Sequence, residues 1–187
     1  MQTRAFALVA HPDFPSRAID GIEVTLERHG DRLDLRFVVV GAIDNVVWPG
    51  DRIDGALPAE HADQCRAHDL WRHSCFEAFV APAGAPGYRE INLATSGHWA
   101  AYAFDGYRAG MRQASDVRLT QAGWRFDDRR AEVSLSIAVS HRQADWALNI
   151  TAIIETSDGG KSYWALAHPP GAPDFHNRDG FVAILPA

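Results

Sequence analysis

The sequence predicts an all-β fold: a single-domain antiparallel β-sandwich of the jelly-roll type spanning residues 1–187. Three observations carry this prediction. Apolar and polar residues alternate with a period of two, turns rich in glycine, proline and aspartate separate the alternating runs, and no long segment has the period of an amphipathic helix. The chain shows no linker or internal repeat, so we expect one domain of about nine to twelve strands.

The clearest element is a hairpin in the first quarter of the chain. Ile22, Val24 and Leu26 alternate with polar residues, and the alternation resumes at Leu33 after the turn His29-Gly30-Asp31. Two runs of period two around a glycine-containing turn predict paired strands with one buried face.

The middle of the chain predicts a loop region followed by further strands. Glycine and proline interrupt the pattern between Ala42 and Asp69, where Glu60–His68 has room for one or two helical turns. Beyond this region, strands are expected over Leu70–Ala81, Tyr88–Leu93 and His98–Phe104.

The last third of the chain predicts a second hairpin. Val133–Val139 alternates as a strand, and Trp146–Thr156 and Lys161–His168 flank the turn Asp158-Gly159-Gly160. The run Phe181–Leu185 predicts a final strand. Short strands joined by such turns are typical of a sandwich.

Charge and hydropathy argue against two classes of partner. The formal net charge is −6 and no basic stripe is present, which argues against nucleic-acid binding. No apolar run approaches the roughly 20 residues of a membrane span, and the apolar N-terminal stretch is too short for a secretory signal. We therefore expect a soluble, cytoplasmic protein, whose oligomeric state the sequence does not fix.

The chain contains two cysteines, Cys65 and Cys75, and they do not form a CxxC motif. Cys75 falls inside an apolar strand pattern, which favours a buried free thiol, with a Cys65–Cys75 disulfide as the alternative. No spacing of ligand residues indicates a metal site, and no cofactor is expected.

One group of polar and aromatic residues predicts a ligand-binding face. In an extended strand Trp71, His73 and Glu77 share a face, and Glu90 and Asn92 share a face of the partner strand. Aromatic rings cover the C–H faces of a sugar, while carboxylates and amides bond its hydroxyls, so we expect a sugar-like ligand on a concave sheet face. The alternative is a solvated outer face with ordinary cross-strand pairs.

A second group lies near the C-terminus. Trp164 and His168 share a strand face, and the following loop contains three prolines and then presents Phe175 and His176. A stiff loop loses little entropy on binding, so these residues are expected to form a rim, to which Trp99 adds aromatic density. The alternative is a rigid crossover with His168 in a structural role.

Several segments resemble the DOMON-like proteins, a superfamily similar to the family-nine carbohydrate-binding modules. The likeness covers about two thirds of the chain. The segments that carry it are Phe76–Phe79, Tyr88–Leu93, Ser96–Tyr102, Ser162–Leu166 and Pro173–His176.

The resemblance implies a β-sandwich that binds sugars or haem without catalysing a reaction. Trp71 matches the tryptophan that stacks on the sugar, and Glu77 matches the acidic residue that bonds hydroxyls. Glu90 and Asn92 match polar positions of the next strand. Phe175–His176 stands where the family has a second stacking tryptophan, so this chain departs from the pattern there.

Two other functions are open. Haem-binding members use methionine with histidine or lysine, whereas this chain has only Met1 and Met111, and Met111 follows a glycine-rich turn.

Glu77, Glu90 and His73 could form an acid–base set for glycoside chemistry, although no nucleophile or metalloprotease motif accompanies them. The calcium-binding loop carboxylates of the sugar-binding modules have no match. The favoured function is a non-catalytic module for a sugar-like ligand.

Overall fold

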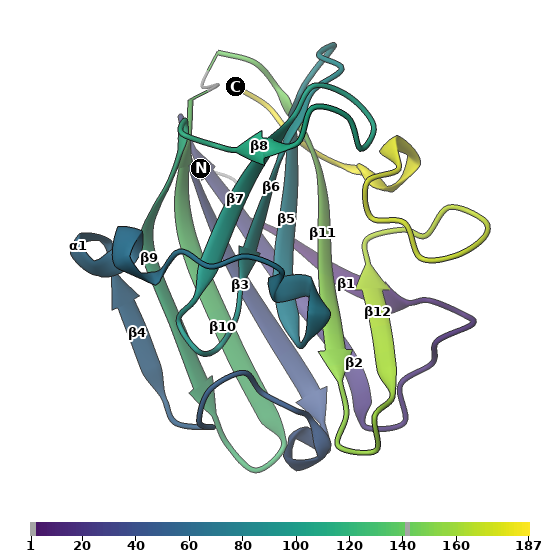
Figure 1. The fold of residues 1–187 in the computed structure, drawn as a ribbon. Coiled ribbons are helices and arrows are strands. Elements are labelled where there is room, and N and C mark those ends of the chain that lie inside the picture. The colour runs from purple at the N-terminus through teal and green to yellow at the C-terminus, as the bar shows by residue number, and fades with distance from the viewer. Residues whose placement is uncertain (1–2, 141–142) are drawn as a thin grey trace.

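The computed structural model describes residues 3–140 and 143–187, and its strands join in one curled antiparallel sheet (Figure 1). The strands are β1 (Arg4–Ala10), β2 (Ile19–His29), β3 (Arg32–Gly41), β4 (Gly55–Pro58), β5 (Cys75–Pro82), β6 (Tyr88–Leu93), β7 (Trp99–Phe104), β8 (Arg112–Gln113), β9 (Val117–Phe126), β10 (Arg130–Val139), β11 (Trp146–Glu155), β12 (Lys161–Ala165) and β13 (Ala183–Leu185). The helical elements are α1 (Ala59–Ala62) and the 3₁₀ turns η1 (Ile43–Asn45), η2 (Asp63–Cys65), η3 (Leu70–Arg72) and η4 (Arg178–Gly180). The all-β prediction is confirmed.

The sheet forms two facing layers. One has the order β4-β9-β10-β3-β2-β1 and the other β12-β11-β5-β6-β7-β8, with β13 on β11. In β1, residues Arg4–Leu8 pair with β2 and residues Val9–Ala10 pair with β12, so this strand joins the layers. Rings from both layers meet between them: the centroids of Phe37 on β3 and Phe76 on β5 are 5.1 Å apart.

Both predicted hairpins are present. β2 and β3 turn at Gly30, whose φ of +65° suits glycine, and β11 pairs with β12 across the Asp158–Gly160 turn. The predicted strand Leu70–Ala81 is wrong at its start. Leu70–Arg72 forms the turn η3 and β5 begins at Cys75, because Ser74 bonds the backbone of both Val47 and Glu155 and fixes the chain there.

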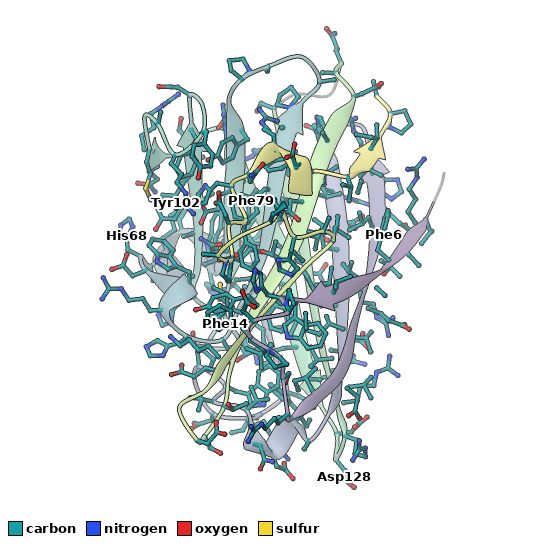
Figure 2. All side chains as sticks on the ribbon, turned by 90° about the vertical axis from the view of Figure 1, so that its right-hand side faces the viewer. Phe6, Phe14, His68, Phe79, Tyr102 and Asp128 are labelled. Atoms are coloured by element: carbon teal, nitrogen blue, oxygen red, sulfur yellow. The ribbon has the colours of Figure 1, made fainter. Side chains whose placement is uncertain are left out.

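Strands β5, β6, β7 and β11 are buried on both faces. On β5, Phe76, Ala78 and Val80 point between the layers, while alternate residues such as Phe79 point outward into a second apolar cluster. The C-terminal segment covers that cluster: Figure 2 shows it in yellow crossing in front of the strands, and the rings of Phe175 and Phe79 are 6.5 Å apart. The face of this layer that points away from the main core is therefore covered by the C-terminal segment, and a pocket can form between them.

Both cysteines are free thiols, and Cys75 is fully buried as predicted, so the alternative disulfide is not formed. None of the helical turns in the two described ranges has the length and apolar character needed to cross a membrane.

Candidate ligand-binding pocket

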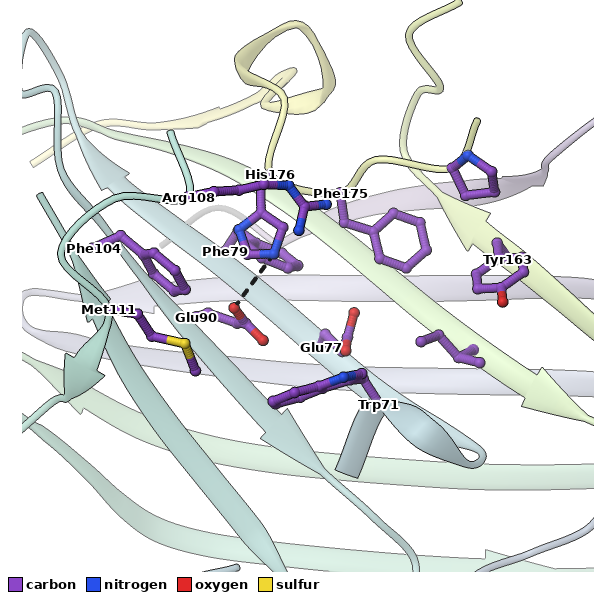
Figure 3. Close-up of a pocket in the computed structure, with 12 residues that line it drawn as sticks. Trp71, Glu77, Phe79, Glu90, Phe104, Arg108, Met111, Tyr163, Phe175 and His176 are labelled. Atoms are coloured by element: carbon purple, nitrogen blue, oxygen red, sulfur yellow. Dashed lines mark ion pairs between the residues drawn. The ribbon is translucent and has the colours of Figure 1, made fainter. Parts of the chain in front are cut away.

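A cavity of about 320 Å³ lies between the outward face of the second layer and the loops that cover it (Figure 3). Its floor comes from β5, β6 and β11, and its walls come from η3, the loop after β7 and the C-terminal segment. The lining residues are Trp71, Glu77, Phe79, Glu90, Phe104, Arg108, Met111, Ile153, Tyr163, Pro173, Phe175 and His176.

Two glutamates on neighbouring strands form the polar floor. Glu77 on β5 is paired in register with Asn92, and Phe79 is paired with Glu90, so the two carboxylates lie diagonally across the β5–β6 ladder. The exposed fractions of Glu77 and Glu90 are only 3% and 4%. Figure 3 shows both side chains pointing into the cavity between Trp71 and His176.

Within the described residues, each carboxylate accepts one hydrogen bond. The Thr151 hydroxyl donates to Glu77 Oε2 at 2.8 Å, and the Asn92 amide donates to Glu90 Oε1 at 2.8 Å. Asn92 Oδ1 is buried and has no hydrogen-bond partner among residues 3–140 and 143–187, whereas Thr151 bonds only the Oε2 atom of Glu77. Unsatisfied buried oxygens are costly, so this floor is suited to a ligand that donates hydrogen bonds.

Burial shifts both carboxyl groups toward their neutral forms. Desolvation, together with the negative charge of Glu90, raises the pKa of Glu77 to about 8. The hydrogen bond from Thr151 acts in the opposite direction. Desolvation raises the pKa of Glu90 to about 7, while the Asn92 hydrogen bond and the charge of Arg108 oppose that shift. The floor therefore takes up or releases protons near neutral pH.

His176 is a neutral donor above the floor. Burial, with a smaller contribution from Arg108, lowers its pKa to about 4. Its Nε2 lies 3.8 Å from Glu90 Oε2, so this contact is not a pair of full charges at neutral pH. The Tyr88 hydroxyl lies 2.7 Å from Nδ1 and also accepts the Arg108 backbone N–H; when this hydroxyl donates to Nδ1, the ring proton lies on Nε2.

Polar contacts at the rim hold the covering loops together. The Arg108 guanidinium pairs with Asp174 Oδ1 at 2.8 Å, and the Tyr107 hydroxyl donates to Asp174 Oδ2 at 2.7 Å. These bonds tie the loop after β7 to the C-terminal segment. The Asn149 side chain supports that segment from below by donating to the Phe175 carbonyl at 3.0 Å.

The structure brings most of the predicted site together. The residues of the prediction that line the cavity or bond its floor are Trp71, Glu77, Glu90, Asn92, Phe175 and His176. Trp71 reaches the cavity from η3 rather than from a strand, with its ring edge against Tyr102.

Four predicted residues lie elsewhere, two of them because alternate side chains of a strand point to opposite faces. His73 lies beyond the η3 turn, is exposed and bonds Glu155. Trp99 and Trp164 point between the layers into the main core, which places the neighbouring Tyr163 at the cavity instead. The side chain of His168 bonds the Val9 carbonyl and does not line the cavity.

Sequence reasoning missed other lining residues. Side chains alternate between the two faces of a strand, and this alternation could have indicated Phe79, Phe104 and Tyr163 once both faces were known to be buried. Arg108 and Met111 come from a loop after β7 that no periodic pattern could place. Met111 follows the glycine-rich turn as expected, and this loop brings it to the cavity.

No family model matches the sequence, and no curated protein matches it. Two solved structures are similar in fold. A protein from Bacteroides uniformis described as "a putative carbohydrate-binding protein" is 14% identical, with a TM-score of 0.60 over 96% of this chain and 83% of that one. A family-nine carbohydrate-binding module from Caldicellulosiruptor kristjanssonii, solved with cellotriose, is 8% identical, with a TM-score of 0.51 over 90% of this chain and 75% of that one. The chain thus has the all-β fold of a family-nine carbohydrate-binding module.

Proposed function

We propose that this protein is a non-catalytic binding module that takes a sugar or sugar-like ring into the pocket between Trp71 and the Phe175–His176 loop. The observation that carries the proposal is the pairing of buried carboxylate oxygens with aromatic walls in one cavity. Its volume of about 320 Å³ lies at the small end of the range for small-molecule sites. The fold shared with a module solved with cellotriose, and the resemblance to DOMON-like proteins, support the same class of ligand.

Each wall has a role in holding such a ring. The face of Trp71 covers the apolar C–H surface, and its indole N–H, which donates to no group within the described residues, is free for a ligand oxygen. Glu77 and Glu90 accept hydrogen bonds from hydroxyls, and the Nε2–H of His176 donates one. A ligand that pairs these groups removes the cost of leaving them unpaired.

Replacing Trp71 by alanine should remove most of the affinity. A stacked aromatic ring contributes about 1–3 kcal/mol, so the dissociation constant should rise roughly 5- to 150-fold. A thermal-shift screen of mono- and disaccharides finds the ligand, since a ligand at 100 times its dissociation constant adds about 2.7 kcal/mol of stability. Calorimetric titration of Trp71→Ala then gives the loss.

Two variants control this experiment. Trp71→Phe keeps a ring at the wall and should retain more affinity than Trp71→Ala. Trp124→Ala removes a tryptophan that donates to Ile53 on the other layer, outside the cavity, and should leave affinity unchanged. Equal binding by Trp71→Ala and the native protein would contradict the proposed site. If the native protein hydrolyses a bound glycoside and Glu77→Gln does not, the non-catalytic assignment is contradicted.

One observation favours haem as a second candidate: Met111 and His176 line the same cavity. His176 Nε2 would be the nitrogen available to iron, with Nδ1 held by Tyr88. The sugar ligand is preferred because the flat apolar face of a porphyrin would leave the floor oxygens of Glu77 unpaired. A Soret band on haem addition, lost in His176→Ala, would support the second candidate instead.

A further inference from the structure

The charges around the cavity are unbalanced. Glu77 and Glu90 are buried carboxylates, and Arg108 is the one cationic side chain in the described lining. That guanidinium is half exposed at the rim and paired with the Asp174 carboxylate, and His176 is neutral. The floor therefore holds two acids without a buried cation.

From this geometry we propose that the pocket selects a sugar bearing a protonated amine and seats the ammonium group between Glu77 and Glu90. The inference rests on the proposed function and narrows it to amino sugars. An ammonium group offers three donors, and the open acceptors of the floor are Glu77 Oε1 and Glu90 Oε2, the latter with only a 3.8 Å contact to His176. A neutral hydroxyl can pair one oxygen but offers no positive charge to the ionised carboxylates, whereas an ammonium group does.

The walls also suit a cation. Trp71, Phe79 and Phe104 surround the floor with ring faces and edges, and a desolvated cation is attracted to the face of an aromatic ring. The other groups that face or bond the two carboxylates are uncharged donors or weak acids: Thr151, Asn92, Cys75, Tyr88 and Tyr102. None of them neutralises the pair.

Seating an ammonium group should also expel protons. Burial keeps both carboxyl groups largely protonated just below neutral pH, and a cation placed between them favours their ionised forms. Binding of an amino sugar at pH 6.5 should therefore release protons, whereas binding of a neutral sugar should not.

The test is calorimetric titration of the intact protein with three amino sugars, glucosamine, galactosamine and mannosamine. Each is compared with its neutral parent and its N-acetyl derivative. At pH 6.5 an amine with a pKa near about 7.7–8.0 is protonated. We expect at least one amino sugar to bind about ten-fold tighter than both neutral counterparts, because a charge-assisted bond exceeds a neutral one by about that factor. Repetition in buffers of different ionisation enthalpy should show net proton release.

The outcomes separate this inference from the proposed function. Neutral sugars that bind as tightly as every amino sugar would overturn the inference and leave the proposed function standing. Binding by no sugar of either kind would contradict both. In Glu77→Gln and in Glu90→Gln, the preference for the amine and the proton release should both fall. Glu155→Gln is the control, because it removes a carboxylate that bonds His73 outside the cavity. This variant should keep the preference and the proton release. Proton release that persists in both floor variants would also overturn the inference.

Discussion

The free energy of unfolding should fall by about 2 kcal/mol as the pH rises from 6.5 to 8, and most of that fall should be absent in Glu77→Gln. The pKa of Glu77 rises from its ordinary value of 4.5 to about 8 in the folded protein, mainly through burial. The folded state therefore holds a proton that the unfolded state has already lost. This stability is fully present below pH 4.5 and is lost as the pH rises through 8.

The chosen window isolates the two glutamates. Glu90, with a pKa of about 7, acts in the same direction. His176, whose pKa is lowered to about 4, and His168, whose pKa is also lowered by burial, have the opposite effect, which fades as the pH rises above their ordinary 6.5. Urea unfolding at pH 6.5, 7 and 8 measures the slope, with Glu23→Gln on an exposed position of β2 as the control. If the free energy of unfolding falls with pH as steeply in Glu77→Gln as in Glu23→Gln, Glu77 does not hold the proton that is lost.

Replacing Phe76 by alanine should cost about 3–5 kcal/mol of stability, a large part of what a protein of this size has. Phe76 follows Cys75 on β5 but points between the layers, where it is 1% exposed and its ring lies 5.1 Å from Phe37 and stacks on Trp48 at 6.4 Å. Removing it leaves a cavity at the contact that joins the two layers.

Urea unfolding at constant pH checks this prediction. Phe14→Ala is the matched control, because Phe14 lies in a loop and is 39% exposed, and it should cost much less. Equal losses for the two variants would show that the layers are not held together at Phe76.

The β2–β3 hairpin was predictable because one face of each of its strands carries polar residues. In β2 and β3 the alternation of Val24, Leu26, Leu33 and Leu35 with polar residues identifies both the strands and their buried face. A glycine at the turn completes the pattern. The two-residue period of an extended strand put Trp71 and Glu77 on one face and Glu90 and Asn92 on one face of the partner strand, and the register of β5 and β6 brings Glu77 and Glu90 together.

The rest of the site could not be predicted from alternation. β7 is apolar at every position, so nothing in it shows that Trp99 faces the core while Phe104 faces the cavity. Trp164 was placed at the rim, but the register of β12 turns it inward and presents Tyr163. Arg108 and Met111 depend on a loop held by the Arg108–Asp174 ion pair, a contact between distant parts of the chain.

The indole N–H resonances of the six tryptophans test the central claim most directly. Trp48, Trp99, Trp124 and Trp164 donate to groups of the protein itself, whereas the indole of Trp71 faces the cavity. Nitrogen–proton correlation spectra, with the Trp71 peak assigned from Trp71→Phe, should be recorded during titration with the sugar that the screen identifies. If the pocket is the binding site, the Trp71 resonance shifts to saturation while those of Trp48 and Trp124 stay in place. A sugar that saturates the protein and leaves the Trp71 resonance unmoved would show that it binds elsewhere.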